Sequence, residues 1–368
     1  MQVAVNARFL IPNRLEGIGR YSFELLSRLA VNNPEVQFHL LFDRPFSEEF
    51  LPAPNMKGHC LRPQARHPWL WYWHYEVQIT RWLQKNPVDV YWGPDAFLAK
   101  SSEGTRSLMT IHDLAWEHNA HWNSSLVSKF YAQWVPQYCD RADHIISISK
   151  ATTNDLVNRY GIAEKKISTI YHGLEANFAT GLVEWQKIPL FNPYFLVLGS
   201  INPRKNSHRL LKAFKAYRET HGGLMHIVFA GELGKGWSSQ EYRFIQECFR
   251  RSDVHYLGSV SEREKKALLY NAKGLLYPSL LEGFGLVLLE AAQFHCPILT
   301  SKLTVCEEVA SHFTNNQGVV YIDPTSHEGL VKGLQALEQT TEGPSVRVQR
   351  SWDDVARETW EVILGVLS

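Results

Sequence analysis

The sequence lacks the features that mark several large classes of protein. Its five cysteines are odd in number and include no Cys-x-x-Cys pair, which argues against a disulfide framework or a zinc ribbon and for a reducing compartment. No run of 18 apolar residues occurs, so we expect no membrane-spanning helix. Lys and Arg number 38 against 37 Asp and Glu, so the net charge of +1 provides no field for a nucleic-acid partner.

Common targeting and catalytic motifs are also missing. The first residues, Met1 to Asn6, contain no basic stretch followed by an apolar one, so we expect no signal peptide and a cytoplasmic location. No Asp-x-Asp triplet is present to hold a metal–diphosphate complex, and the glycines of Gly231 to Gly236 have the wrong spacing for a P-loop. Neither a Gly-x-Ser-x-Gly elbow nor a His-Glu-x-x-His motif occurs.

What is present is an alternation of short apolar runs and amphipathic stretches over 368 residues, with 45% hydrophobic and 20% charged residues. This pattern predicts an α/β protein of two units with mostly parallel sheets. The linker between the units is expected at residues 179–193, and a helix is expected at 19–30. The strand candidates are residues 3–5, 36–42, 88–91, 108–111, 145–148, 167–171, 195–198, 226–230, 254–257, 274–277, 297–300 and 319–322.

Three further helices can be anticipated from local patterns. Ser261 with Glu264, and Thr325 with Glu328, have the spacing of capping boxes at helix starts. Apolar residues recur at three- and four-residue intervals from Trp352 to Val366, which indicates an amphipathic helix. The pattern alone is typical of a terminal core helix, although the polar loop before it would also let it pack away from the second unit.

The segment from Tyr277 to Ala291 is the most informative one for function. A strand ends at a Pro-Ser turn, and Glu282-Gly283-Phe284-Gly285-Leu286 follow before a helix that carries Glu290. Open α/β sheets bind ligands at the carboxyl ends of their strands, and a helix N-terminus favours an anion. Fully helical spacing would separate Glu282 and Glu290 by roughly 12 Å along the axis. That is too far for a glycosidase carboxylate pair at roughly 5–9.5 Å, but it suits two ends of one elongated ligand.

Three other strand-to-helix loops carry candidate residues. Gly199 is followed by Arg204 and Lys205, which could clamp a diphosphate or only form a solvated face. Gly17 and Gly19 make an incomplete dinucleotide fingerprint, for which a simple phosphate-approach loop is the better interpretation. His112, before Asp113, is placed either to stabilise developing charge or to hold the loop.

Residues 62–85 are rich in both aromatic and basic side chains. They include Trp69, Trp71, Tyr72, Trp73, Tyr75 and Trp82 together with Arg62, Arg66, Arg81 and Lys85. Such a mixture suits a membrane interface or a lipid-linked acceptor. The alternative is a helix whose aromatic residues pack on the core of the first unit.

In order along the chain, these segments resemble the retaining glycosyltransferases of family 4, which have the GT-B architecture. The resemblance runs from Ile18-Gly19-Arg20-Tyr21 through His112-Asp113, Arg204-Lys205-Asn206 and Gly231-Glu232 to Glu308-Val309 and Asp323-Pro324. Its most specific part is Glu282-Gly283-Phe284-Gly285 with Glu290. Departures occur at Phe294-His295-Cys296, at Val305-Cys306 and at His172-Gly173, and they concern the shape of the nucleotide pocket.

The resemblance implies two Rossmann-like domains facing across a cleft. Residues 1–180 would bind the acceptor, residues 190–348 the nucleotide sugar, and residues 349–368 would form a helix that crosses back to the N-terminal domain. Metal independence is typical of the family, so neither a metal nor any other cofactor is expected besides the nucleotide diphosphate sugar as co-substrate.

The resemblance also implies residue roles. Glu290 would hold the ribose hydroxyls of the donor and Glu282 the transferred sugar, with the backbone amides of Phe284, Gly285 and Leu286 near the sugar and phosphates. Arg204 and Lys205 would clamp the diphosphate, with Gly17 approaching it from the other domain. His112 would lie near the reacting sugar.

The function predicted from these features is retaining transfer of a hexose to a saccharide or lipid-linked saccharide acceptor. The segment Gly17 to Tyr21 is similar to bacterial members that use GDP-mannose-type donors in surface polysaccharide synthesis, which would place the protein at the inner face of the membrane. Alternatives are a GT-B epimerase or phosphorylase, a non-catalytic nucleotide-sugar-binding protein and, more distantly, a dinucleotide-dependent oxidoreductase.

Overall fold

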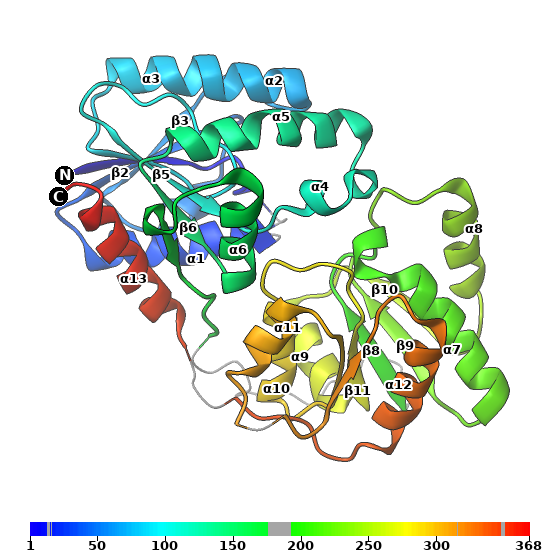
Figure 1. Ribbon diagram of the computed structural model, residues 1–368. Coiled ribbons are helices and arrows are strands. Elements are labelled where there is room, and N and C mark those ends of the chain that lie inside the picture. Colours follow the sequence, from blue (N-terminus) through cyan, green and yellow to red (C-terminus); the bar gives the residue numbers. More distant parts are fainter. Residues whose placement is uncertain (13–14, 16, 176–192, 315, 347–349) are drawn as a thin grey trace. The chain divides into compact units, whose positions relative to one another are not determined.

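The computed structural model describes residues 1–12, 15, 17–175, 193–314, 316–346 and 350–368 (Figure 1). Its internal contacts divide the chain into two compact units. Unit 1 comprises Met1–Ala120, Ser124–Gly173 and Arg350–Ser368, and unit 2 comprises His121–Asn123 and Leu174–Gln349. Apart from Pro193, the linker expected at residues 179–193 lies outside the described residues.

Unit 1 is built on a parallel sheet in the order β3-β2-β1-β4-β5-β6-β7. Its strands are β1 (Gln2–Asn6), β2 (Gln37–Phe42), β3 (Met56–Cys60), β4 (Val90–Gly93), β5 (Arg106–Ile111), β6 (His144–Ser147) and β7 (Ile167–Thr169). Its helices are α1 (Gly17–Asn32), α2 (Pro68–Trp73), the π-helix η2 (His74–Ile79), α3 (Thr80–Lys85), α4 (Ala115–His118), α5 (Ser125–Arg141), α6 (Lys150–Tyr160) and α13 (Trp352–Gly365).

Burial on both faces explains why most strands of unit 1 could be predicted. The middle residues of β1 and β4 are completely buried, as expected for parallel strands covered by helices on both sides. Strand β3 was not predicted, because it lies at the edge of the sheet and its sequence Met-Lys-Gly-His-Cys has neither a buried run nor a clear alternation. The predicted first helix is confirmed as α1, with Tyr21, Leu25, Leu26 and Leu29 all buried.

The C-terminal helix α13 packs in unit 1. It contacts α1, where Arg28 pairs with Asp353 at 3.0 Å. The buried Trp352 lies edge-on to Tyr21, with 6.2 Å between ring centroids. A side chain at Gly173 would come within 2.5 Å of the backbone of Ser351, so the chain needs glycine where the two segments cross.

Unit 2 has a second parallel sheet, in the order β10-β9-β8-β11-β12-β13. Its strands are β8 (Tyr194–Leu198), β9 (His226–Ala230), β10 (Val254–Gly258), β11 (Gly274–Tyr277), β12 (Ile298–Ser301) and β13 (Val319–Ile322). Its helices are the 3-10 turn η5 (Pro203–Lys205), α7 (Ser207–His221), α8 (Ser239–Cys248), α9 (Glu262–Asn271), α10 (Leu286–Gln293), α11 (Thr304–Ala310) and α12 (His327–Gln339).

Only one of the two predicted capping boxes forms. At α9 the Ser261 side chain accepts from the Glu264 amide and the Glu264 carboxylate accepts from Ser261, as the sequence indicated. The prediction at Thr325 was wrong, because Ser326 caps α12 and accepts a hydrogen bond from the Gly329 amide. Thr325 instead bonds Asp323, which directly follows β13.

Each sheet reverses its strand order at one point. In unit 1 the reversal lies between β1 and β4, and in unit 2 it lies between β8 and β11. Loops that leave neighbouring strands on opposite sides of such a point diverge, and this divergence opens a crevice at the carboxyl ends of the strands. The sites described below follow these four strands and β5.

Candidate active site

The loop after β8 is held close to the loop after β9. Gly199 adopts a φ of +102°, and its amide donates to the carbonyl of Ala230. A Cβ at Gly231, whose φ is +151°, would lie 2.0 Å from the carbonyl oxygen of Gly199. The position of Gly199 therefore favours glycine because of its positive φ. The position of Gly231 requires glycine because any side chain there would push the two loops apart.

Two asparagines shape the turn that carries the basic pair. The Asn202 side chain accepts a hydrogen bond from the Lys205 amide and so caps η5. Asn206 follows in the left-handed conformation, and its side-chain amide donates to the carbonyl of Pro324 at 2.6 Å. The Arg204 carbonyl accepts from the amide of Leu280, which ties this turn to the loop after β11.

Arg204, Lys205 and Glu282 form one cluster beside the reversal point of the second sheet. The Lys205 ammonium lies 2.6 Å from Glu282 Oε1 and 3.2 Å from the hydroxyl of Tyr277. The Arg204 guanidinium donates to the carbonyl of Leu281 at 3.1 Å and lies 3.5 Å from Glu282 Oε2. The side chains of Arg204, Lys205 and Glu282 are only 23%, 15% and 7% exposed, so the cluster is largely withdrawn from water.

Attraction between the opposite charges of the cluster opposes the effect of burial on their ionisation. Burial by itself would raise the pKa of Glu282, but the charges of Lys205 and Arg204 outweigh it and lower that pKa below its ordinary value. Burial lowers the pKa of Lys205, an effect that the carboxylate of Glu282 opposes. Two cations thus surround one carboxylate, and the surplus positive charge suits an anionic ligand such as a diphosphate.

The glycine-rich segment leads directly into α10. Gly285 precedes the helix with a φ of +103°, and it offers no side chain to cap the helix. Gly283 and Phe284 are buried, whereas Leu286, the first helical residue, is half-buried. The positive end of the helix dipole therefore lies on the same loop as Glu282.

Glu290 lies on α10, one turn after its first residue, and points toward α9. Its Oε1 is 2.6 Å from the ammonium of Lys265, and its side chain is 7% exposed. The fully helical spacing assumed for Glu282 and Glu290 was wrong, because the helix begins only at Leu286. The two glutamates nevertheless have separate cationic partners, Lys205 and Lys265.

The predicted residues of unit 1 follow the carboxyl end of β5 and begin α1. His112 directly follows β5, and its Nε2 lies 2.9 Å from the carbonyl of Pro94. A carbonyl can only accept, so Nε2 carries the proton, and Nδ1 is the acceptor of a neutral ring. Burial lowers the pKa of His112, which favours that neutral form. Gly17 is the exposed first residue of α1, with open space around its Cα.

Sequence reasoning missed a polar network at the reversal point of the first sheet. Asn6 ends β1, and its side-chain amide donates to Asp95 at 2.9 Å and to the Tyr75 hydroxyl at 3.1 Å. Burial raises the pKa of Asp95 to about 7. Arg8 lies over the ring of Trp71, 4.7 Å from its centroid. A polar residue at the end of each apolar run, Asn6 and Asp95, is the signal that could have revealed this network.

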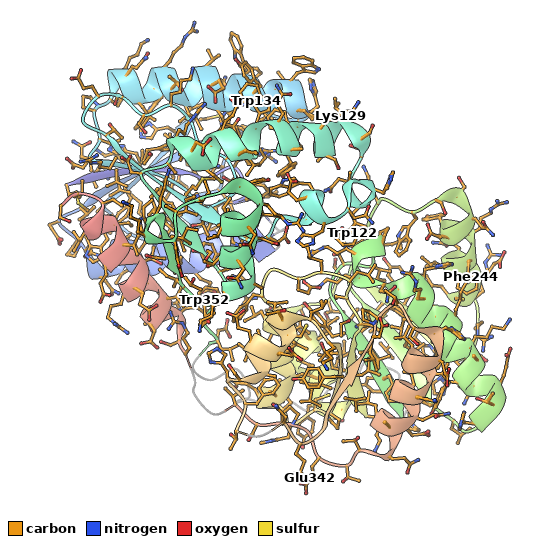
Figure 2. The ribbon with its side chains drawn as sticks, viewed as in Figure 1. Trp122, Lys129, Trp134, Phe244, Glu342 and Trp352 are labelled. Carbon is orange, nitrogen blue, oxygen red and sulfur yellow. The ribbon has the colours of Figure 1, made fainter. Side chains whose placement is uncertain are left out.

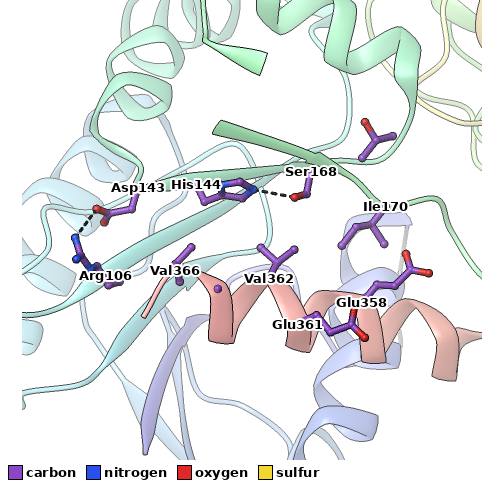
Figure 3. Close-up of a pocket in the computed structure, with 11 residues that line it drawn as sticks. Arg106, Asp143, His144, Ser168, Ile170, Glu358, Glu361, Val362 and Val366 are labelled. Carbon is purple, nitrogen blue, oxygen red and sulfur yellow. Dashed lines mark hydrogen bonds and ion pairs between the residues drawn. The ribbon is translucent and has the colours of Figure 1, made fainter. Parts of the chain in front are cut away.

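A groove of about 670 Å³ in unit 1 lies away from these residues (Figure 3). It is bordered by β7, by the beginning of β5 and β6 and by α13. In it His144 bonds Ser168 at 2.9 Å and Arg106 pairs with Asp143 at 3.3 Å. Because Arg106 and His144 stand at the amino ends of their strands, the groove is separate from the end of β5 that carries His112.

The aromatic segment at residues 62–85 divides between core and surface. Tyr75 is fully buried, and Trp71 packs against the core of unit 1. On α2, Trp69, Tyr72 and Trp73 are 72%, 37% and 43% exposed. The core-packing interpretation therefore holds for Tyr75 and Trp71, whereas the membrane interpretation stays a prediction for the exposed residues of α2.

No helix in the described part of the chain has the length and apolar character needed to cross a bilayer. Within the same residues, no three His, Cys, Asp or Glu side chains come together as a metal-binding group.

Two family models match the chain one after the other. Residues 15–178 match "Glycosyltransferase Family 4", and residues 184–351 match "Glycosyl transferases group 1". The chain is 25% identical to O-antigen chain mannosyltransferase B of Escherichia coli over 94% of its length and 95% of the relative's. It is also 25% identical to O-antigen chain mannosyltransferase RfbU of Salmonella typhimurium, over 78% of its length and 76% of the relative's.

The fold is also shared with solved structures of similar length. Anabaena HepE in complex with UDP-glucose superposes with a TM-score of 0.63 at 12% identity, over 100% of this chain and 97% of that one. Together, the two successive family matches and the two Rossmann-like sheets show that the chain belongs to the family 4 glycosyltransferases of GT-B type.

Proposed function

We propose that this glycosyltransferase moves a hexose, with mannose as the first candidate, from a nucleotide diphosphate sugar to a hydroxyl group of a saccharide or lipid-linked saccharide. Configuration at the anomeric carbon is retained, no metal takes part, and the product belongs to a bacterial surface polysaccharide. The observation that carries the proposal is the buried cluster of Arg204, Lys205 and Glu282. The names of the O-antigen mannosyltransferase relatives support the choice of sugar and pathway.

In the proposed reaction the bond between the anomeric carbon and the diphosphate oxygen breaks while a bond to the acceptor oxygen forms on the same face. Negative charge develops on the leaving diphosphate, where Arg204 and Lys205 stabilise it together with the backbone amides at the start of α10. The departing phosphate oxygen accepts the proton of the acceptor hydroxyl, so the step balances without a side-chain base.

In this proposal Glu282 holds the hydroxyls of the transferred sugar. When the diphosphate enters, its oxygens compete with Glu282 for the two cations. Both are ionised acceptors, and such acceptors form strong hydrogen bonds with charged donors. The carboxylate then has acceptor capacity for the sugar hydroxyls. His112, neutral and able to accept at Nδ1, is proposed to contact the reacting sugar, and Gly17 to approach the diphosphate.

The test begins with donor selection. Thermal unfolding is measured with GDP-mannose, UDP-glucose, UDP-galactose and ADP-glucose, because a ligand that binds only the folded state raises the melting temperature. We expect GDP-mannose to produce the largest shift. The selected donor is then incubated with lipid-linked saccharides, and the anomeric configuration of the product is read by NMR.

Two outcomes would contradict the proposal. A protein that binds a donor but never releases the nucleotide, with any acceptor tried, is a nucleotide-sugar-binding protein. Release of an isomerised free sugar without an acceptor would instead indicate an epimerase.

We further propose that the exposed part of α2 places the enzyme on the cytoplasmic face of an anionic membrane. Trp69 and Trp73 project from α2, and Tyr72 contacts Trp134 of the neighbouring helix α5 at 4.9 Å between ring centroids. On α5, Leu126 is 50% exposed, and the exposed Lys129 lies on the same helix as Trp134 (Figure 2). Aromatic rings suit the interfacial layer of a bilayer, and basic residues near an anionic surface contribute about 1 kcal/mol each.

Vesicle flotation tests this contact. Wild-type protein is expected to float with phosphatidylglycerol vesicles and not with phosphatidylcholine vesicles. Replacing both Trp69 and Trp73 with Ser should reduce the floating fraction without changing the melting temperature. The matched control, Leu224→Ser, removes a side chain that is 77% exposed in unit 2 and should leave flotation unchanged. Equal flotation of the double variant and the wild type would contradict the proposed surface.

A further inference from the structure

Helices α9 and α10 of unit 2 are joined by an ion pair that no motif in the sequence announced. The ammonium of Lys265 on α9 lies 2.6 Å from Oε1 of Glu290 on α10. The same ammonium lies 2.9 Å from Oε2 of Glu262, three residues earlier on its own helix. The side chains of Lys265 and Glu290 are 16% and 7% exposed, whereas that of Glu262 is 48% exposed.

The position of Lys265 is determined by the beginning of α9. The capping box between Ser261 and Glu264 holds the first turn of the helix, and the Lys265 amide donates to the Ser261 carbonyl at 2.9 Å. Lys265 thus projects from the first turn after the cap, where the backbone is well constrained. The ammonium is consequently delivered to Glu290 from a rigid element.

The charge of Lys265 matters because of where Glu290 lies. The helix α10 has the sequence Leu-Val-Leu-Leu-Glu-Ala-Ala-Gln, and four of the neighbours of Glu290 on it are buried apolar residues. Burial among apolar groups disfavours an ionised carboxylate, and a cation in contact restores it. For Lys265, burial lowers its pKa, but the two carboxylates outweigh burial and raise that pKa above its ordinary value. The pair is therefore held in its charged form.

We infer that Lys265 is a positioning residue for the ribose of the donor nucleotide. It keeps the Glu290 carboxylate ionised and oriented, so that the carboxylate accepts hydrogen bonds from the 2′- and 3′-hydroxyls. Hydrogen bonds to an ionised acceptor are stronger than those to a neutral one, so the lysine increases affinity without touching the nucleotide. The inference rests on the role in donor binding that the family resemblance implies for Glu290.

The experiment compares nucleotides that differ only in their ribose hydroxyls. Calorimetric dissociation constants are measured for GDP and UDP and for their 2′,3′-dideoxy analogues, with wild type, Lys265→Met, Lys265→Arg, Glu290→Gln and Glu262→Gln. Wild type should prefer the ribonucleotide. Lys265→Met should bind the ribonucleotide roughly 10- to 100-fold more weakly, the range for losing a hydrogen bond to a charged group. Its affinity for the dideoxy analogue should be unchanged.

A pH series separates this role from a merely structural one. Without the ammonium, burial favours the protonated form of the Glu290 carboxyl, and a rising pH opposes protonation. The ribonucleotide affinity of Lys265→Met should therefore recover as the pH is raised, while that of wild type stays level. Lys265→Arg should behave like wild type because it keeps the charge. Glu262→Gln, which removes only the exposed partner, should change affinity less than threefold.

The outcomes distinguish a failure of this inference from a failure of the donor-binding role of Glu290. If no nucleotide binds to wild type, or if Glu290→Gln keeps the preference for ribose, the proposed donor role of Glu290 is wrong. If Glu290→Gln loses that preference but Lys265→Met keeps it, only the inference about Lys265 is overturned. Equal weakening of both nucleotides at every pH by Lys265→Met also overturns it. Should Lys265→Met fail to fold, Lys265→Gln provides the same comparison.

Discussion

His172 makes the free energy of unfolding of unit 1 depend on pH. One substitution can isolate this contribution. His172 is buried beside the docking point of the C-terminal helix, with its ring 5.5 Å from that of Trp352 and 5.2 Å from that of Tyr21. Burial, together with the neighbouring His112, lowers the pKa of His172 to about 3. The folded protein therefore keeps this ring neutral at pH values where the unfolded chain protonates it.

The direction and size of the effect follow from linkage. Because the folded pKa lies below the unfolded value of about 6.5, stability is lost as the pH falls through 6.5 and continues to fall until about pH 3. Between pH 7 and pH 4 this one group should destabilise the fold by about 3 kcal/mol, at about 1.4 kcal/mol for each pH unit over which only the unfolded chain gains the proton. Asp95, whose pKa burial raises to about 7, acts in the opposite direction over part of the same range.

The assay compares wild type with His172→Phe, which keeps a ring against Trp352 but cannot be protonated. Urea unfolding is followed by tryptophan fluorescence at pH 7 and pH 4. The loss of stability between the two should be smaller by about 3 kcal/mol in the variant. Contributions from Asp95 are present in both proteins and cancel in the difference. His67→Phe, at an exposed histidine of the same unit, should lose as much stability as wild type. An acid sensitivity in His172→Phe equal to that of wild type would refute the reasoning.

Two further predictions concern other parts of the chain. Gly285→Ala should lower the free energy of unfolding by about 1–2 kcal/mol, because φ is +103° where α10 begins. Gly365→Ala should not lower it, because an added Cβ there would meet no atom within 4 Å. Equal effects of the two substitutions on the melting curves would contradict this. One thiol, that of Cys60, should react rapidly with a disulfide reagent in the native protein, because Cys139, Cys248, Cys296 and Cys306 are buried; fast reaction of more than one thiol would show that the cores open readily.

Local patterns were sufficient to predict most of the fold. Buried parallel strands such as β8 and β11 appear in the sequence as short apolar runs between polar loops, so their number and order could be anticipated. The edge strand β3 could not, because one of its sides carries no sheet partner and its residues show no clear pattern. At α12 the sequence predicted a cap at Thr325, but in the folded chain Thr325 bonds Asp323 and Ser326 caps the helix instead.

The charged cluster of the candidate site could be anticipated because its residues lie on loops that follow neighbouring strands. Arg204, Lys205 and Glu282 follow strands that proved to be neighbours, so strand order brought the predicted basic pair onto the predicted glutamate. The partner of Glu290 was not predictable, because Lys265 lies 25 residues away on another helix and has no motif of its own. The network of Asn6, Tyr75 and Asp95 was missed for the same reason, since it depends on tertiary contacts between distant segments.

The most direct test of the central claim is the turnover number of Lys205→Ala with the selected donor and its acceptor. Lys205 is argued to stabilise charge that develops on the leaving diphosphate, so kcat should fall by about 10²- to 10³-fold while the KM for the acceptor changes little. Lys215→Ala, at a half-exposed lysine on α7 in the same unit, should turn over at the wild-type rate. Near-normal turnover by Lys205→Ala would contradict the account, since the cluster would then have no part in the chemistry.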